Sequence, residues 1–493
     1  MRKLFFALFV FPLVAFAQVQ TSGGVNWIDP LAYPKPRFVS LTLPAAGANQ
    51  YWVDLGSGSG SACTQSSPCA WSSLSGKPGM ADGTGAYVYI RGTGGLADIS
   101  IVGAAGKEVV IEPWNLSATG SCNDGTTATI TGQNAWTANK QHMIIDGGPN
   151  LQICFWNDTN SEFAGSIDWN STTGNALSIT IARCHFHVIG AGEWMGTHGG
   201  WNGLTLVNNE FEATGSTDTA NQHHLYWSGA YGANLTNFNL VANVLRDTPG
   251  EVVELRPCGG AVMSSFTFDG NAVHNIGKGS CGTWNCRTFI TFSSDTSGCT
   301  SGGTISAPIQ VTNNLLFDIG GSCIDVGNLP GTGKIYNNTC IQWGQGTGGN
   351  GTWGSVGYVN GALSGGTPVG DYRNNIFYAT GTYGGATKVP FISNSSHGSN
   401  HICIPGDTAC GSSSLAYQTS GTTQTLASTD WTQSGFGTVN GATSNAVGNG
   451  MNEYATTTVD YLGQPRSASG AWSGGAIEYV GGLLPPLNVR FVQ

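Results

Sequence analysis

Six short segments of the sequence repeat one pattern: an apolar residue, a spacer, an asparagine, a spacer and a second apolar residue. The asparagines that hold the equivalent place, at intervals of 24 to 43 residues, are Asn209, Asn243, Asn271, Asn314, Asn338 and Asn375. Repeats at such periods are typical of stacked coils, in which no single unit can bury its apolar face alone. An inward asparagine in every coil can hydrogen-bond to its neighbours above and below. The pattern therefore predicts a β-solenoid with a buried asparagine ladder.

The first 17 residues have the features of a secretory signal peptide. Arg2 and Lys3 precede an apolar stretch over residues 4–16, and Ala15-Phe-Ala17 fits a cleavage site. No later stretch reaches the length of a membrane-spanning helix. We therefore expect a secreted protein without a membrane span, either extracellular, periplasmic or held at the cell surface.

The charge balance narrows the class of partner. The formal net charge is −10, and loss of Arg2 and Lys3 with the signal peptide would make it −12, while only 9% of residues are charged. Such a sparse, acidic surface is poorly suited to nucleic acid or anionic membranes, which need basic patches. It also disfavours strongly anionic polymers, so a neutral polysaccharide is the more favoured partner.

The chain has 13 cysteines, an odd number, which in an exported protein indicates disulfides and one unpaired thiol. The close pairs Cys63/Cys69, Cys281/Cys286 and Cys403/Cys410 are expected to form small loops. Up to three more bridges can form among Cys122, Cys154, Cys258, Cys299, Cys323 and Cys340, with the pairing left open. Cys184 occupies a ladder position, where other coils have asparagine, and is therefore predicted to be the buried, unpaired one.

The pattern of strands and turns divides the chain into segments. Residues 1–17 are the signal peptide, 18–50 an N-terminal arm, and 51–141 an N-terminal cap with the first β coils. Regular coils with strands of about four to six residues are expected over 142–380, and a loop-rich C-terminal cap and tail over 381–493.

Several motifs lie outside the asparagine repeats: Tyr51-Trp-Val-Asp with Pro68-Cys-Ala-Trp71 after it, Val88-Tyr-Ile-Arg91, His142-Met-Ile-Ile-Asp-Gly147, and a closing pair of segments at 460–466 and 475–479. Together with the repeats, they resemble the secreted right-handed parallel β-helix proteins of the pectate-lyase-like group, and the likeness spans nearly all of the mature chain. The resemblance implies an all-β, right-handed parallel β-helix. Because the group includes lyases, hydrolases, epimerases and inert surface proteins, it leaves the activity open.

Alignment of successive coils on their apolar residues predicts a polar patch on one face. Strand alternation turns Leu225, Val253, Ile290 and Ile324 inward. One outward column then contains Tyr226, Glu254, Thr291 and Asp325, and a second beside it contains Ser228, Arg256 and Ser293. His224 is expected on the same face as Tyr226. We take His224, Tyr226, Glu254, Arg256 and Asp325 as candidate catalytic residues, and Ser228 and Thr291 as substrate-binding residues.

Two reactions fit these residues. Glu254 and Asp325 would lie two coils apart, on the order of 9.6 Å, at the upper edge of the spacing between acid and base in an inverting glycosidase. In a lyase, Arg256 would neutralise a uronate while Tyr226 or His224 moves protons. The structural alternative is an outward polar ladder in which Glu254 only pairs with Arg256.

Metal and aromatic signals are weaker. Gly250-Glu-Val-Val-Glu254 is similar to the G-E-x-E stretch of chondroitinase-B-like and alginate lyases, but its second glutamate stands three residues on and the following Lys-Ser is absent. The calcium site of those enzymes is therefore not assigned here, and no metal ligand is predicted. Trp194 and Trp201 are candidate platforms for a sugar ring if they are exposed, whereas Trp227 is expected in the core.

Two classes of function remain at this point. The first is a polysaccharide-active enzyme, lyase or glycoside hydrolase, with a groove along the coil face that is flanked by the insertions at 274–310 and 341–370. The second is a non-catalytic glycan-binding or adhesin-like surface protein whose β-helix is a rigid wall.

Overall fold

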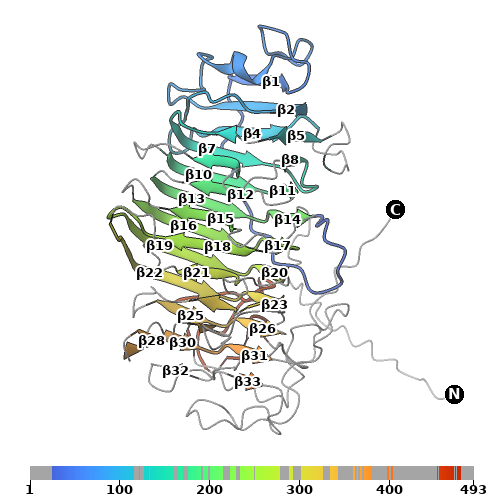
Figure 1. Cartoon of the computed structure of the whole chain (residues 1–493). Coiled ribbons are helices and arrows are strands. Elements are labelled where there is room, and N and C mark those ends of the chain that lie inside the picture. Colours follow the sequence, from blue (N-terminus) through green and yellow to red (C-terminus); the bar gives the residue numbers. More distant parts are fainter. Residues whose placement is uncertain are drawn as a thin grey trace, which may run out of the picture.

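The computed structural model shows an all-β parallel β-helix, in which strands stack from β1 at one end to β33 at the other (Figure 1). This fold was predicted from the asparagine repeat and the motifs around it. The structure describes residues 25–115, 122, 127–132, 134–158, 165–169, 176–189, 193–197, 200–214, 223–228, 234–248, 250–277, 288–292, 301–321, 323–325, 333–341, 359–360, 363–364, 367–368, 371–378, 397–398, 401–403, 452–453, 455–470, 472–473 and 475–478.

Each turn of the helix passes through three parallel sheets. Sheet 1 contains β1 (Gln50–Asp54), β2 (Ala86–Gly94), β3 (Ile101–Val102), β4 (Val109–Pro113), β7 (Lys140–Asp146), β10 (Ala176–Ala182), β13 (Trp201–Val207), β16 (Leu235–Val241), β19 (Val262–Asp269), β22 (Thr304–Thr312), β25 (Lys334–Tyr336), β30 (Asp371–Arg373) and β32 (His397–Gly398). Sheet 2 contains β5 (Ala128–Thr131), β8 (Ile153–Asn157), β11 (Cys184–Ile189), β14 (Glu210–Thr214), β17 (Val244–Arg246), β20 (Ala272–Ile276), β23 (Leu315–Ile319), β26 (Thr339–Ile341), β31 (Ile376–Tyr378) and β33 (His401–Cys403). The long strand β2 pairs with both β4 and β5 and so joins these two sheets.

Sheet 3 contains β6 (Asn134–Ala135), β9 (Gly165–Trp169), β12 (Glu193–Thr197), β15 (His223–Ser228), β18 (Glu251–Arg256), β21 (Ile290–Phe292), β24 (Ile324–Asp325) and β27 (Val359–Asn360). A short 3-10 helix, η1 (Trp71–Leu74), follows β1, and β28 (Leu363–Ser364) pairs antiparallel with β29 (Thr367–Pro368). Within the described ranges, no helix is long and apolar enough to cross a membrane.

The asparagine ladder is present as predicted. All six asparagines are completely buried. Asn271 is typical: its Nδ2 donates to Leu240 O at 2.8 Å and to Asn314 Oδ1 at 2.9 Å, while its Oδ1 accepts the backbone N–H of Asn243 at 3.0 Å. Each asparagine thus satisfies buried groups in the coils on both sides of it, which a single coil could not do for itself.

The residue before each ladder position makes the bend from sheet 1 into sheet 2. In seven successive coils this residue has a φ between 52° and 69°, in the left-handed region; the residues are Arg183, Asn208, Ala242, Gly270, Asn313, Asn337 and Asn374. Glycine and asparagine adopt this conformation more readily than other residues. Each Asn-Asn pair of the sequence therefore has two structural roles: the first asparagine forms the bend, and the second belongs to the ladder.

The described disulfides and the unpaired cysteine agree with the predictions, and the predicted partner of Cys403 lies outside the described residues. Cys63 pairs with Cys69, Cys122 with Cys154, and Cys323 with Cys340. Cys258 is also disulfide-bonded, whereas Cys281, Cys286, Cys299 and Cys410 lie outside the described residues. Cys184 is buried and unpaired at the head of the ladder, where its backbone N–H donates to Asn209 Oδ1 at 2.9 Å. These disulfides fit an oxidising, exported environment; the expected signal peptide lies in the part of the chain that is not described.

The outer face of sheet 2 is covered in its later coils by two segments from the ends of the chain. Its outward residues there are apolar, among them Leu315 and Phe317. Tyr33 of the N-terminal arm packs edge-on against Phe317, with ring centroids 5.0 Å apart, and Tyr461 of the closing segment joins the same buried cluster. The arm runs beside β14 and β17 in Figure 1. Coverage removes an apolar surface that would otherwise face solvent.

The closing segment is held by buried polar groups. Arg466 is 2% exposed and donates to Asn313 Oδ1 at 2.9 Å and to Glu478 at 2.5 Å. Asp460 accepts the backbone N–H groups of Leu462, Gln464 and Glu478. The ionic partner of Arg466 is therefore Glu478, and Asp460 orders the turn beside it.

Asp29 anchors the arm, and this contact predicts a dependence on pH. The buried carboxylate accepts from Lys35 Nζ at 2.8 Å and lies 3.0 Å from His274 Nε2. Burial alone would raise the pKa of Asp29, but the hydrogen bonds and charges of His274 and Lys35 outweigh it and hold the pKa well below its usual value. A depressed carboxyl pKa contributes stability above the unfolded value of about 4, and that contribution is lost as the pH falls further.

We therefore expect Asp29→Asn to be less stable than the wild type at neutral pH, with a difference that shrinks below about pH 4 by up to ~1.4 kcal/mol per pH unit. Thermal unfolding of both proteins between neutral pH and pH 3 measures this. Glu108→Gln, outside the arm, is the matched control. A difference between Asp29→Asn and wild type that stays constant with pH would contradict the assignment.

Candidate functional site

The polar column predicted on the coil face is present on sheet 3. Strand pairing places Tyr226 beside Glu254, Glu254 beside Thr291, and Thr291 beside Asp325. The apolar residues used for the alignment, Leu225, Val253, Ile290 and Ile324, are all completely buried. The four column residues therefore occupy equivalent positions on β15, β18, β21 and β24. Each directly follows an inward-facing residue along its strand.

Glu254 and Asp325 are two coils apart in this register, with Thr291 between them. Adjacent coils of a parallel sheet are about 4.8 Å apart, so two steps span on the order of 9.6 Å. Tyr226 and Glu254 are 5% and 7% exposed, respectively. The column thus has one carboxylate packed close to the sheet and a second acidic position at the upper edge of the spacing that allows a water molecule between an acid and a base.

Arg256 belongs to the same patch through a neighbouring position. It is paired in register with Ser228, and its Nη1 donates to Tyr226 Oη in a long contact of 3.4 Å. A guanidinium next to a phenol oxygen can stabilise negative charge that develops on that oxygen or on a ligand bound beside it. Arg256 is therefore placed to act on the same ligand as Tyr226.

His224 does not share the outer face with Tyr226, which differs from the expectation. It is completely buried, and its ring centroid lies 4.5 Å from that of Trp194. At the start of the sheet 3 strands, two consecutive residues face the core instead of one, as Val252 and Val253 do in β18. Simple alternation begins only after this pair, so the position of His224 is interior.

The two candidate aromatic platforms are also interior. Trp194 is completely buried, and its Nε1 donates to Glu212 O at 2.8 Å. Trp201 is 4% exposed, with its ring centroid 5.5 Å from that of Trp227, which is in the core as predicted. Both tryptophans stabilise the packing between sheets and do not offer a ring face to a sugar.

The column extends further than the sequence analysis recognised. Ala135 pairs with Asp168, Asp168 with Gly196, and Gly196 with Tyr226, while Asn360 follows Asp325 at the other end. Asp168 and Asn360 therefore hold the same register position as Glu254. Alignment of Ile167 with Met195 and Leu225 would have found Asp168. Because Gly196 has no side chain, the row of side chains is interrupted at the position next to Tyr226.

The described side chains that could together bind a metal ion lie outside sheet 3. Groups of three or more histidine, cysteine or carboxylate ligand atoms occur among the described side chains only on the outer face of sheet 2. The insertions expected to flank a groove fall largely on residues 278–287, 293–300 and 342–358, outside the described ranges.

The fold is a parallel β-helix, and the register of sheet 3 aligns acidic residues with Tyr226 on one face, next to Arg256. Among solved structures, the chain is similar to pectate lyase Pel9A, with a TM-score of 0.50 and 11% identity over 88% of this chain and 97% of that chain. A rhamnogalacturonan lyase aligns over 80% of this chain and 97% of its own, with a TM-score of 0.39 and 14% identity. The first likeness shows the fold alone. No family model and no curated protein matches the sequence.

Proposed function

We propose that this protein is an exported glycan-active β-helix that cleaves a polysaccharide on the outer face of sheet 3. The observation that carries the proposal is the column in which Tyr226, Glu254, Thr291 and Asp325 stand in register, with Arg256 bonded to Tyr226. In a chain with only 9% charged residues, two acidic positions and an arginine on one face are a concentrated set of functional groups.

The spacing favours hydrolysis with inversion. One carboxyl of the Glu254–Asp325 pair would protonate the glycosidic oxygen, and the other would take a proton from the water that attacks the sugar carbon. The position of Thr291 between them, with a small side chain, leaves room for that water. Tyr226 and Arg256 would orient the sugar hydroxyls on the neighbouring coil. An extended chain of sugars could follow the column, because successive positions repeat about every 4.8 Å.

A neutral polysaccharide suits this face best. The mature chain carries a formal charge of −12 after loss of Arg2 and Lys3, and three acidic residues, Asp168, Glu254 and Asp325, share the column. A polymer with one carboxylate per sugar would be repelled along most of its length. Arg256 supplies the positive charge of this patch.

The contact between Arg256 and Tyr226 favours a second candidate, β-elimination of a uronate. Arg256 would neutralise the sugar carboxylate, and Tyr226 would take the proton from the adjacent carbon. The bond between the next carbon and the glycosidic oxygen would then break, and that oxygen would leave with a proton taken from water. The activity named for the similar structure, a pectate lyase, belongs to that class. His224 has no part in either reaction, because it is interior. A non-catalytic glycan-binding wall is the third alternative, in which the column only binds sugars.

The test is a panel of neutral and acidic polysaccharides incubated with the purified chain. Hydrolysis is expected to produce new reducing ends without ultraviolet absorbance, whereas elimination would add the absorbance of an unsaturated uronate. Binding without either product would support the non-catalytic alternative. Neither cleavage nor binding of any polymer would reject the proposed function.

A further inference from the structure

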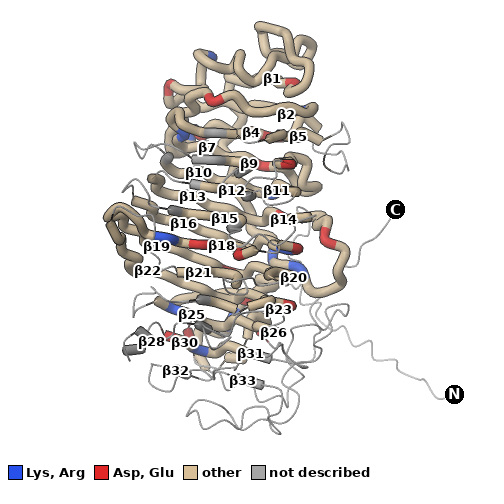
Figure 2. The backbone as a smooth tube through the Cα atoms, viewed as in Figure 1, with Lys and Arg blue, Asp and Glu red and all other residues tan. Residues whose placement is uncertain are grey.

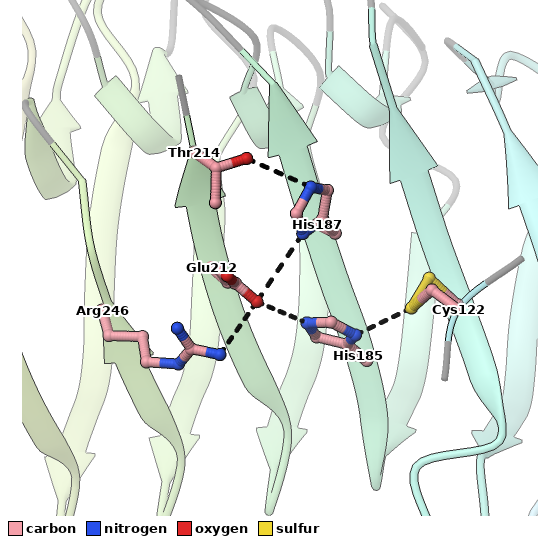
Figure 3. The surroundings of a disulfide bond; sticks show 7 residues. Cys122, His185, His187, Glu212, Thr214 and Arg246 are labelled. Atoms are coloured by element: carbon pink, nitrogen blue, oxygen red, sulfur yellow. Dashed lines mark hydrogen bonds and ion pairs between the residues drawn. A yellow bond between two sulfur atoms is a disulfide. The ribbon is translucent and has the colours of Figure 1, made fainter. Parts of the chain in front are cut away.

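A cluster of histidine and glutamate side chains lies on the outer face of sheet 2, away from the proposed glycan site. His185 and His187 of β11 alternate with the inward Phe186, and Glu212 of β14 is paired in register with His187. Figure 3 shows both imidazoles directed towards Glu212, with Arg246 of β17 on its other side. Charged residues also gather beside β17 and β20 in Figure 2, along an otherwise sparsely charged stack.

The distances within the cluster fit the ligand shell of a small divalent ion. His185 Nε2 lies 3.3 Å and His187 Nδ1 lies 3.6 Å from the same Glu212 oxygen, and the ligand atoms of all three residues lie within 4.8 Å of one another. Ligands of a tetrahedral zinc ion, with bonds of about 2.0–2.2 Å, are separated by about 3.3–3.6 Å. We propose that His185, His187 and Glu212 bind one divalent transition-metal ion of the zinc type.

The other nitrogen of each imidazole already has a partner. His187 Nε2 lies 3.3 Å from Thr214 Oγ1, and His185 Nδ1 contacts the sulfur of Cys122 in its disulfide with Cys154. The contact with Thr214 can fix the orientation of the His187 ring, as the partner of the second nitrogen does in a metal-binding histidine. The nitrogens that would bind an ion are the two that face Glu212, and both must be unprotonated to do so.

The side chains are held in place before any ion arrives. His185 and His187 are 4% and 9% exposed, and the ring of His187 stacks on Trp156 with centroids 4.2 Å apart. The Glu212 side chain is 16% exposed, so the cluster is open to solvent on one side. Three protein ligands with one open position are the arrangement in which zinc keeps a water molecule or a further ligand.

The net negative charge around the cluster favours a divalent cation. Arg246 contacts Glu210 at 2.8 Å, Glu212 at 2.8 Å and Asp247 at 2.5 Å, so three carboxylates surround one guanidinium and two negative charges remain. Arg246 would then be a hydrogen-bond donor that orients the ligating carboxylate.

The experiment is a calorimetric titration with zinc at neutral pH. The sample is the untagged full chain, treated with a chelator beforehand and kept without a reducing agent. We expect one zinc ion per chain, and we expect cobalt in the same site to give the visible absorption of a tetrahedral complex. His187→Gln and Glu212→Gln should each weaken zinc binding by at least about tenfold. Thr214→Val, which removes only the partner of His187, should weaken it less. His142→Gln, on β7, is the matched control and should bind as the wild type does.

Several outcomes would overturn the proposal. They are the absence of zinc binding to the wild type, and equal binding by wild type, His187→Gln and Glu212→Gln when circular dichroism shows all three folded. Binding that appears only after reduction and survives Glu212→Gln would also overturn it, because Cys122 and Cys154 would then be the ligands beside His185. None of these measurements uses glycan cleavage, so the metal site and the proposed function are tested independently.

Discussion

Replacement of Asn271 by leucine is expected to lower the free energy of unfolding by about 3–5 kcal/mol. The Asn271 side chain accepts from Asn243 N and Asn243 Nδ2, at 3.0 and 3.1 Å, and donates to Leu240 O and Asn314 Oδ1. Leucine is similar in size but can replace none of these bonds. The backbone N–H of Asn243 is then left in a dry interior, and an orphaned buried donor costs about 1–3 kcal/mol by itself.

The matched control is Asn239→Ala on β16. Asn239 is a partly exposed asparagine of a neighbouring strand whose Nδ2 donates to Thr205 Oγ1 at 3.2 Å, so its loss should cost less than about 1 kcal/mol. Thermal and urea unfolding, followed by circular dichroism, compare the two variants with the wild type. Equal effects of the two substitutions would mean that the ladder adds no more to stability than a surface hydrogen bond does.

The coiled architecture could be predicted because its constraints are local and repeat. The pair Asn313–Asn314, for example, places a left-handed bend and a ladder side chain one residue apart, and the same pair recurs in other coils. The position of the arm could not be predicted in the same way. Asp29 meets His274 across 245 residues, and a single contact between such distant segments leaves no periodic trace in the sequence.

The register of the candidate site was predictable, but the expected exposure of His224, Trp194 and Trp201 was wrong. Leu225 and Val253 fixed the column because an inward position tolerates only residues that pack in the core. His224 was misplaced because alternation was extended to the first residues of the strand, where two successive residues face inward. Consecutive apolar pairs at the equivalent places, such as Val252-Val253 and Phe289-Ile290, carried that information.

The histidine cluster was missed although the ladder could have located it. His185 and His187 stand one and three residues after Cys184, and Glu210 and Glu212 stand one and three residues after Asn209. Counted from the ladder, these are equivalent outward positions on adjacent strands, so the side chains must be neighbours. The alignment on apolar residues brought together only residues of sheet 3, whereas the cluster lies on the sheet that directly follows the asparagines.

The substitution Glu254→Gln is expected to lower kcat for glycan cleavage by about 10²–10⁴-fold, because it removes one member of an acid–base pair. Glutamine keeps the shape of a side chain that is 7% exposed, so the fold and the affinity for the glycan should change little. Asp325→Asn should have an effect of similar size if the two carboxylates act together. Initial rates of reducing-end release, with binding measured separately, give kcat and affinity for each variant.

The double variant Glu254→Gln/Asp325→Asn separates a catalytic pair from two independent contacts. Residues that act as a unit in one step are strongly non-additive, so the double variant should be about as slow as the slower single variant. Glu108→Gln, between β3 and β4, is the matched control and should retain full activity. Full activity of Glu254→Gln would show that the Glu254–Asp325 pair has no catalytic role. A rate that falls only in Tyr226→Phe and Arg256→Ala would instead move the chemistry to their contact, and would favour elimination over hydrolysis.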